Sequence, residues 1–308
     1  MSQIIPEKPL RVVVWSTGTI GKHAIAGVDA HPDLELVGVW TSTADKHGKD
    51  VGELAGLDRE LGIRATTDRD ELVALRPDCI VHGAMTDDRV FESIADLTEL
   101  IRDGVNVVSS GPVILLHRTG TLPAEMIETI DEAGRQGNAS LHVNGIDPGF
   151  ANDVLPLVMT SLSQRIDHIK VSEIADYSTY YQPVVMGEIF GFGRPLDEVP
   201  MLFQPGILSM AWGSVVRQIA AGLDLPLVRL QCYEGIDASQ ALYDWDFPRQ
   251  ILHLRALEAG TDVVDVEKAE SSLFDERFLL ARPVLRALRE SPAVLLVDEV
   301  DRADDEFE

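Results

Sequence analysis

Apolar and polar positions alternate in blocks over the first 140 residues. The run Leu10–Trp15 is rich in β-branched apolar residues and predicts a buried strand, and a second apolar run over Leu34–Trp40 predicts another. The segment His23–Ala30 lies between them and has the amphipathic spacing of a helix. The pattern therefore predicts a strand–helix–strand unit at the start of the chain.

Strand and helix patterns continue to alternate after this unit. Helical spacing recurs in further segments before residue 140, namely 48–57, 68–75, 90–103 and 124–136. Short apolar strands are predicted over 78–82 and 105–109. Such alternation is typical of an α/β fold with a doubly wound parallel sheet. Beyond a polar loop, a helix is expected over 154–162 and a sheet strand over 168–174.

A turn with two glycines joins the first strand to the first helix. Gly18 and Gly21 match the last two glycines of the dinucleotide fingerprint G-x-G-x-x-G, and Ser16 stands where its first glycine would be. The glycines would let the backbone approach a pyrophosphate, whose charge is favoured by the N–H groups at a helix start. The predicted cofactor-binding residues of this turn are Ser16, Thr17, Gly18, Thr19, Ile20 and Gly21.

Two alternatives stay open for this turn. A strand, a turn and a helix also occur in this order without any ligand. The stretch Ser16–His23 also resembles a P-loop, G-x-x-x-x-G-K-[ST], but both of its ends differ, and His23 lacks the hydroxyl that would hold Mg²⁺. The second strand has the spacing that a dinucleotide site needs, which favours the dinucleotide hypothesis.

The residues after the second strand bear on the identity of the cofactor. An acidic residue there would bind the ribose 2′-hydroxyl of NAD, but the chain has Thr41-Ser42-Thr43, with Asp45 and Lys46 beyond. Ser42 and Lys46 would suit the 2′-phosphate of NADP, unless Lys46 is simply a solvated loop residue. The expected cofactor is NADP or NAD. Further cofactor-binding residues are expected where later strands end at the same edge of the sheet: Gly83, Ala84 and Ser109.

The segment 140–153 joins a strand to a loop rich in polar and turn-forming residues. Its candidate substrate-binding residues are His142, Asn144, Asp147 and Asn152. The alternative is structural, because Asn144 and Asp147 each begin a turn sequence and Asn152 or Asp153 would cap the next helix. Sequence chemistry alone favours the structural alternative.

Composition limits the classes of partner. The 308 residues include 51 acidic and 26 basic side chains, and the net charge of −25 argues against nucleic acid or an anionic membrane as a partner. No apolar run approaches the ~20 residues that cross a bilayer, and the N-terminus lacks the pattern of a signal peptide. Cys79 and Cys232 imply no disulfide framework. A cytoplasmic protein is therefore expected.

Seven motifs resemble, in combination, one protein family. They are Trp15–Lys22, His31–Trp40, Gly52–Gly56, Gly104–Ser109, Gly145–Asp153, Gly191–Pro195 and Ala211–Gln218. Over about residues 8–222 the chain resembles the dihydrodipicolinate-reductase-like proteins, and it is similar to 2,4-diaminopentanoate dehydrogenases and related NAD(P)-dependent amine dehydrogenases. The resemblance implies a Rossmann domain, an α+β substrate domain and oxidative deamination by hydride transfer to nicotinamide. For that chemistry His142 and Asp147 would handle protons, and Asn144 and Asn152 would orient the substrate.

Residues 225–308 resemble part of a MoxR-type AAA+ ATPase. The pentapeptide Leu295–Glu299 matches its Walker B pattern, in which Asp298 would hold Mg²⁺ and Glu299 would act on the attacking water. No P-loop accompanies this pattern in the sequence. Together the two resemblances imply a chimera with a dinucleotide-binding domain over 1–140, a partial substrate domain over 141–224 and an AAA+-like fragment over 225–308.

Three functional hypotheses follow from the sequence. The first is an NAD(P)-dependent oxidoreductase that acts on the CH–NH₂ group of a small-molecule amine or amino acid and holds no metal. The second is a protein derived from an AAA+ ATPase, with incomplete ATP-binding machinery. The third is a catalytically inactive dinucleotide-binding module. An incomplete substrate domain would expose apolar surface, which would favour a homo-oligomer.

Overall fold

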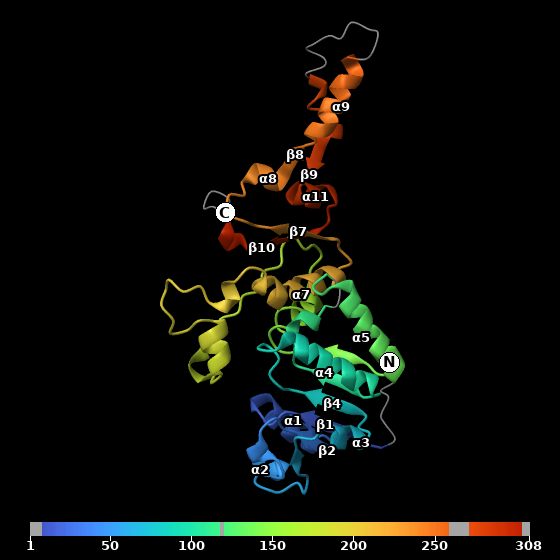
Figure 1. Ribbon diagram of the computed structural model, residues 1–308, viewed down its shortest axis with the longest axis vertical. Helices are drawn as coiled ribbons and strands as arrows, with labels where there is room; N and C mark the ends of the chain where they lie inside the picture. Colours follow the sequence, from blue (N-terminus) through green and yellow to red (C-terminus); the bar gives the residue numbers. More distant parts are fainter. Residues whose placement is uncertain (1–7, 118–119, 259–270, 304–308) are drawn as a thin grey trace. The chain divides into compact units, whose positions relative to one another are not determined.

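Six parallel strands form the main sheet, in the order β3-β2-β1-β4-β5-β6 (Figure 1). The computed structural model describes residues 8–117, 120–258 and 271–303. The strands of this sheet are β1 (Leu10–Trp15), β2 (Leu34–Trp40), β3 (Ala65–Thr66), β4 (Cys79–His82), β5 (Asn106–Ser109) and β6 (Leu141–Val143). Each adjacent pair is parallel, so the predicted parallel sheet is confirmed.

The order of the strands reverses at β1. The chain passes from β1 to β2 and β3 on one side, and then returns to place β4, β5 and β6 on the other side. In sheets of this kind ligands bind at the carboxyl ends of the strands where the order reverses, which here are β1 and β4.

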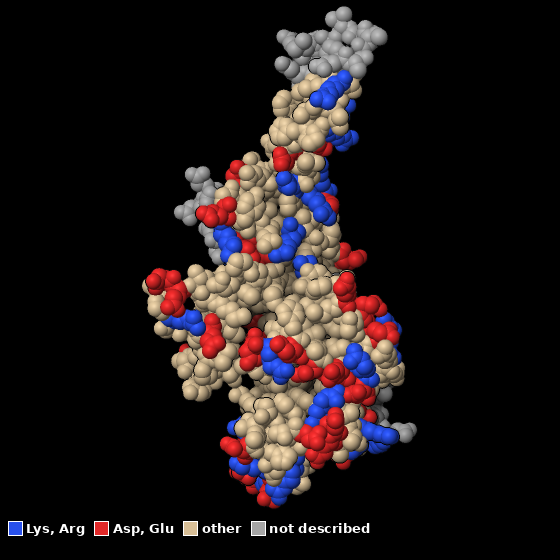
Figure 2. All heavy atoms as spheres, viewed as in Figure 1, with Lys and Arg blue, Asp and Glu red and all other residues tan. Residues whose placement is uncertain are grey.

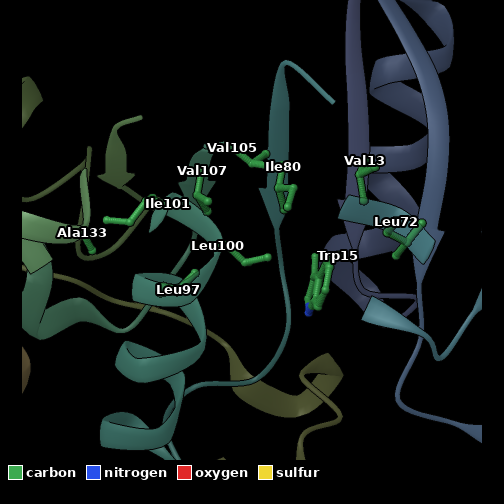
Figure 3. Packing of buried hydrophobic residues seen from close by; sticks show 10 residues of the cluster. All are labelled: Val13, Trp15, Leu72, Ile80, Leu97, Leu100, Ile101, Val105, Val107 and Ala133. Carbon is green, nitrogen blue, oxygen red and sulfur yellow. The ribbon is translucent and has the colours of Figure 1, made fainter. Parts of the chain in front are cut away.

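Helices cover both faces of this sheet. One face carries α1 (Thr19–Ala30) and α2 (Val51–Ala55), and the other carries α3 (Arg69–Ala74), α4 (Val90–Arg102) and α5 (Ala124–Gly137). Successive side chains of β1 point to opposite faces, so Val12 and Val14 pack with Ile25 of α1. On the other face Val13 belongs to the core that includes Leu97 of α4 (Figure 3). These two apolar layers fix the sheet between its helices.

Two tryptophans lie at the carboxyl ends of the central strands. The rings of Trp15 on β1 and Trp40 on β2 are stacked, with centroids 5.0 Å apart and an interplanar angle of 8°. Parallel pairing places these residues opposite each other. Because both rings pack at the strand ends, they help to hold the edge of the sheet from which the glycine turn begins.

The rest of the N-terminal unit, after β6, contains helices and extended backbone. Its elements are α6 (Val154–Thr160), η3 (Tyr177–Thr179), the π-helix η4 (Val184–Ile189), η5 (Met201–Phe203) and α7 (Ile207–Gly222). Two 3₁₀ helices, η1 (Ala44–Lys46) and η2 (Val113–Leu115), precede β6. The strand expected over 168–174 was a wrong prediction, because this segment is neither strand nor helix. Its apolar residues alternate, but no neighbouring strand pairs with it, and Ile174 is 97% exposed.

The described chain forms two compact units, Met1–Gln218 and Ile219–Glu308. The elements of the second unit after α7 are β7 (Leu227–Gln231), α8 (Ala238–Leu242), β8 (Tyr243–Trp245), α9 (Phe247–Glu258), η6 (Glu276–Phe278), β9 (Leu279–Ala281), α11 (Pro283–Arg289), β10 (Val294–Asp298) and η7 (Val300–Arg302). Strands β7 and β10 pair in parallel, and β8 pairs antiparallel with β9. A small core around Leu230, Cys232 and Ile236 lies beside the parallel pair.

Acidic and basic side chains are mixed on the surface shown in Figure 2. On the face of each unit shown in Figure 2, Lys and Arg side chains are interspersed with Asp and Glu, so the described residues form no continuous basic surface on that face. Within the described part of the chain, every helix is too short or too polar to cross a membrane.

We predict that Gly21→Ala destabilises the N-terminal unit by about 1–3 kcal/mol, because the new Cβ would lie 2.1 Å from the carbonyl oxygen of Ser16. Gly27→Ala, in the same helix, is the matched control, since nothing lies within 4 Å of its Cβ. Helix propensity predicts a gain of about 0.5–1 kcal/mol for this control. Urea unfolding of both variants measures the difference. Equal stability of Gly21→Ala and the wild-type protein would contradict the close contact.

Candidate active site

The turn after β1 brings the start of α1 against the end of the strand. A side chain at Gly21 would collide with the backbone of Ser16, so this glycine is required by the close approach. The Ser16 hydroxyl accepts a hydrogen bond of 3.0 Å from the N–H of Gly18. The φ angle of Ser16 is 159°, close to extended, so this position accommodates a serine. The departure from the glycine fingerprint at Ser16 therefore leaves the turn intact.

Backbone N–H groups at the start of α1 are available to a ligand. The N-cap, Gly18, offers no side-chain acceptor, and the first turn of the helix has no acidic residue. In the described part of the chain, the N–H groups of Thr19, Ile20 and Gly21 have no hydrogen-bond partner, as expected for the first residues of a helix. Together with the helix dipole, these groups favour a bound anion.

Hydroxyl groups and one lysine lie beside this turn. The Oγ1 atoms of Thr17 and Thr41 are 3.0 Å apart, which links the ends of β1 and β2. Lys46 donates from Nζ to the carbonyl oxygen of Thr17 at 3.1 Å and to its Oγ1 at 3.2 Å. Lys46 is half-buried and Ser42 is exposed. These contacts hold the Lys46 ammonium next to the glycine turn, whereas a solvated loop lysine would have no such partners.

The end of β4 also reaches the glycine turn. A Cβ on Gly83 would lie 2.8 Å from Cγ2 of Ile20, so the loop after β4 passes close to the start of α1 and a larger residue here would displace the Ile20 side chain. Ala84, the next residue, is half-buried against the core beneath the sheet. The structure thus places Gly83 and the α1 turn side by side, as the sequence predicted for a common edge.

A buried histidine pairs with Ser109 at this same edge. Nδ1 of His82, the last residue of β4, is 3.0 Å from Oγ of Ser109, and Ser109 also hydrogen-bonds to the carbonyl oxygen of Gly111. Burial, with a further contribution from the positive charge of Arg89, lowers the pKa of His82 to about 4, so the imidazole is neutral at pH 7. Sequence analysis had missed His82 as a site residue, although a polar residue that ends an apolar strand was a usable signal.

The loop after β6 holds two of the predicted substrate residues together. Asn152 donates from Nδ2 to Oδ1 of Asp147. The neighbouring Asp153 is buried, accepts from the N–H of Gly149 at 2.8 Å and caps α6. The capping role considered in the sequence therefore belongs to Asp153, which leaves Asn152 to hold Asp147.

His142 and Asn144 lie elsewhere. Both line a cavity of about 1060 Å³ that is bounded by α5 and β6, and the side chain of His142 is exposed. Asp147 lines a different cavity, of about 430 Å³. The four predicted residues thus fall into two pairs, and Asp147 shares its cavity with further carboxylates.

The 430 Å³ cavity combines an apolar wall with three carboxyl groups. The apolar and aromatic lining includes Val113, Ile146, Tyr180, Phe190, Met210 and Trp212. The carboxyl groups belong to Asp87, Asp147 and Glu173. Burial, together with the neighbouring Glu173, raises the pKa of Asp147 to about 6. An apolar cavity with a few convergent polar groups is a typical small-molecule site.

The C-terminal unit places Asp298 in an ion pair. Asp298 ends β10, is buried, and accepts from Nε of Arg229 at 2.9 Å and from Nη2 at 2.5 Å. Glu299 follows with a left-handed backbone and lies 3.4 Å from Arg302. Among the described residues, no three His, Cys, Asp or Glu side chains are placed to hold a metal ion. The two Walker B candidates therefore face arginines in this structure.

Comparisons with known proteins agree with the main resemblance. No protein-family model matches the chain. It is 42% identical over 219 residues to an amine dehydrogenase of Streptomyces virginiae, a match that covers 71% of this chain and 60% of the relative. It is 23% identical over 175 residues to a 4-hydroxy-tetrahydrodipicolinate reductase of Nostoc sp. strain PCC 7120, covering 54% of this chain and 59% of the reductase.

Among solved structures, the amine dehydrogenase of Mycobacterium smegmatis matches with a TM-score of 0.45 and 25% identity, over 52% of this chain and 46% of that one. The chain spans about three fifths of the length of the curated relatives it matches. The two sequence matches support the similarity to amine dehydrogenases and dihydrodipicolinate-reductase-like proteins. The resemblance of residues 225–308 to AAA+ ATPases stays a prediction.

The neutral, buried His82 predicts a pH dependence of stability. Its folded pKa of about 4 lies below the usual value of 6.5, so between these two values the unfolded chain binds more protons. We expect the stability advantage of the wild-type protein over His82→Asn to shrink by roughly 2–3 kcal/mol as the pH falls from 7 to 4. Urea unfolding at several pH values measures it.

Ser109→Ala is the control for this experiment. It removes the hydrogen-bond partner at Oγ but leaves a buried imidazole, so the pH dependence should persist in it. A stability difference between wild type and His82→Asn that is constant from pH 7 to pH 4 would show that His82 is not held neutral by the fold.

Proposed function

We propose that this chain is an NAD(P)-dependent oxidoreductase that deaminates a small amine. The single observation on which the proposal depends is the β1–α1 turn, where Gly21 passes the carbonyl of Ser16 and the first N–H groups of α1 have no partner among the described residues. A dinucleotide pyrophosphate suits this position, because it brings negative charge and acceptor oxygens to the helix start. The similarity to an amine dehydrogenase supports the same assignment.

The residues around the turn favour NADP over NAD. Lys46 is held at the end of β1 by Thr17, and Ser42 lies exposed between Thr41 and η1. An ammonium and a hydroxyl suit a 2′-phosphate, and no acidic residue occupies the end of β2, where one would bind a free 2′-hydroxyl. Gly83, Ala84 and Ser109 would complete the cofactor site along the edge of the sheet.

The substrate would occupy the 430 Å³ cavity. A bound nicotinamide would supply the hydride acceptor for oxidation of the carbon that carries the amine, and water would convert the resulting imine to a carbonyl compound and ammonia. Asp147 is suited to take a proton, because its raised pKa of about 6 is near neutral pH. Asn152 orients Asp147 through its amide. His142 and Asn144 remain predicted site residues for a substrate group that reaches the other cavity.

The proposal also covers the domain organisation, the location and the assembly of the chain. We retain the division into a dinucleotide-binding domain over 1–140, a partial substrate domain over 141–224 and an AAA+-like fragment over 225–308. ATP hydrolysis is not favoured, since the Asp298 carboxylate is already paired with Arg229. A small-molecule substrate, a cytoplasmic location and a homo-oligomer are further expectations.

We predict that NADPH binds more tightly than NADH and that Lys46→Gln weakens NADPH about tenfold while leaving NADH nearly unchanged. The physical reason is the loss of one charge-assisted bond to the 2′-phosphate. Nicotinamide fluorescence titration measures both affinities. Lys49→Gln is the control, because Lys49 is exposed three residues away.

Two outcomes would contradict parts of this prediction. An unchanged NADPH affinity in Lys46→Gln would remove the argument for NADP but not for a dinucleotide. No binding of either cofactor at millimolar concentration would overturn the assignment of the β1–α1 turn.

Turnover is tested separately from binding. With NADP⁺ and a panel of primary amines, we expect the absorbance of reduced nicotinamide to rise, and Asp147→Asn to lower the rate by about 10²–10⁴-fold. Glu53→Gln, at an exposed position of α2, is the control. If the chain binds the cofactor and oxidises no amine, the inactive dinucleotide-binding module is the better description.

A further inference from the structure

The carboxyl groups of the 430 Å³ cavity are fixed by neighbouring donors. Glu173 accepts a hydrogen bond of 3.1 Å at Oε1 from the hydroxyl of Tyr177. Asp147 is held by the amide of Asn152 and by the side chain of Trp212. Asp147 and Glu173 both line the cavity, and the negative charge of Glu173 acts on Asp147. The two carboxyl groups therefore form a pre-positioned pair.

Among the described residues that line the cavity, no positive side chain balances this pair. The described lining residues include Asp87, Asp147 and Glu173 but no Lys, Arg or His. Adjacent carboxyl groups repel each other when both are ionised, and the negative charge of Glu173 adds to the effect of burial in raising the pKa of Asp147. A ligand cation between them would relieve the repulsion, whereas a ligand carboxylate would increase it.

The remaining wall is apolar and aromatic. Phe190 and Tyr177 pack edge to face, with centroids 5.6 Å apart, and Trp212, Met210 and Ile146 complete the lining. A volume of about 430 Å³ accommodates a ligand of small-molecule size. Such a wall stabilises an aliphatic or aromatic group by removing its surface from water.

We infer that the Asp147–Glu173 pair binds the ammonium group of a lipophilic primary amine and excludes amino acids, whose carboxylate would meet the same negative charge. This inference rests on the proposed function, because it names the substrate class and assigns Glu173 as a specificity-determining residue of the same site. Alkyl amines have a pKa near that of lysine, about 10.4, so they enter as cations at neutral pH.

A ligand that cannot be oxidised tests the inference without turnover. The carbon that bears nitrogen in 2-phenyl-2-propylamine has no hydrogen, so no hydride can leave it. The alcohol 2-phenyl-2-propanol has the same shape and no charge. By calorimetric titration of the full chain at pH 7.5, we expect the amine to bind at least about tenfold more tightly than the alcohol.

Variants then assign this preference to the pair. Asp147→Asn and Glu173→Gln should each reduce the preference for the amine about tenfold, while the affinity for the alcohol changes little. Glu125→Gln, an exposed carboxylate on α5, is the control and should keep the wild-type preference. If Asp147→Asn does not fold, the Glu173→Gln variant alone tests the inference. Glu173 is exposed, so we expect its replacement to leave the fold intact.

Competition and pH complete the test. In competition with bound 2-phenyl-2-propylamine, phenylalanine should be at least about tenfold less effective than 2-phenylethylamine. The amine affinity should rise as the pH increases from 5 to 7, since the Asp147 carboxyl ionises in this range, and Asp147→Asn should flatten that rise. Equal binding of amine and alcohol, or of amine and amino acid, would overturn the inference.

The outcomes distinguish this inference from the proposed function. If NADPH binds and amines are oxidised but Glu173→Gln keeps the wild-type preference, the function stands and the carboxyl pair is not the ammonium site. If the preference is lost as expected in the variants but no cofactor binds, the ammonium site stands and the oxidoreductase proposal fails.

Discussion

The contact between Gly21 and the carbonyl of Ser16 is the constraint on which the candidate active site depends. A side chain at position 21 would move α1 away from the end of β1. Three other features need α1 in its present place: the unpartnered N–H groups of its first turn within the described chain, the close passage of Gly83 by Ile20, and the contact of Lys46 with Thr17. One missing Cβ thus positions the proposed cofactor side of the candidate site.

The N-terminal unit contains two regions of opposite electrostatic character. The turn after β1 offers backbone N–H groups, a helix dipole and the Lys46 ammonium, all of which favour phosphate oxygens. The 430 Å³ cavity offers carboxyl groups and an apolar wall, which favour a lipophilic cation. A dehydrogenase that joins an anionic dinucleotide to a cationic amine needs both kinds of region. The overall charge of −25 does not show this division, because it sums over the whole surface.

Local sequence patterns predicted the strands of the central sheet well, but they indicated only some of the residues around the candidate site. The runs Leu10–Trp15 and Leu34–Trp40 are strands with those bounds, because buried parallel strands have continuous apolar sequences. Helix α1 begins at Thr19, four residues before the predicted start, since the glycine turn leads directly into its first turn. The segment 168–174 alternates like a strand, but a strand needs a partner, and alternation does not supply one.

Contacts between distant residues explain most of what sequence analysis missed. Glu173 acquires its role only through Tyr177 and Asp147, and His82 through Ser109. At Asp298 a motif suggested a metal ligand for the ATPase hypothesis, and the adjacent strand supplies Arg229 as an ion-pair partner. Lys46 could be proposed from its position after β2, but its contact with the glycine turn depends on the fold.

Residue-resolved amide hydrogen exchange tests the central claim most directly. The account predicts that saturating NADPH slows exchange at Thr19, Ile20 and Gly21, because their N–H groups acquire phosphate acceptors, while exchange in the exposed C-terminal half of α1 near Gly27 is unchanged. Unchanged exchange at these three amides in the presence of bound NADPH would contradict it, since the dinucleotide would then lie elsewhere.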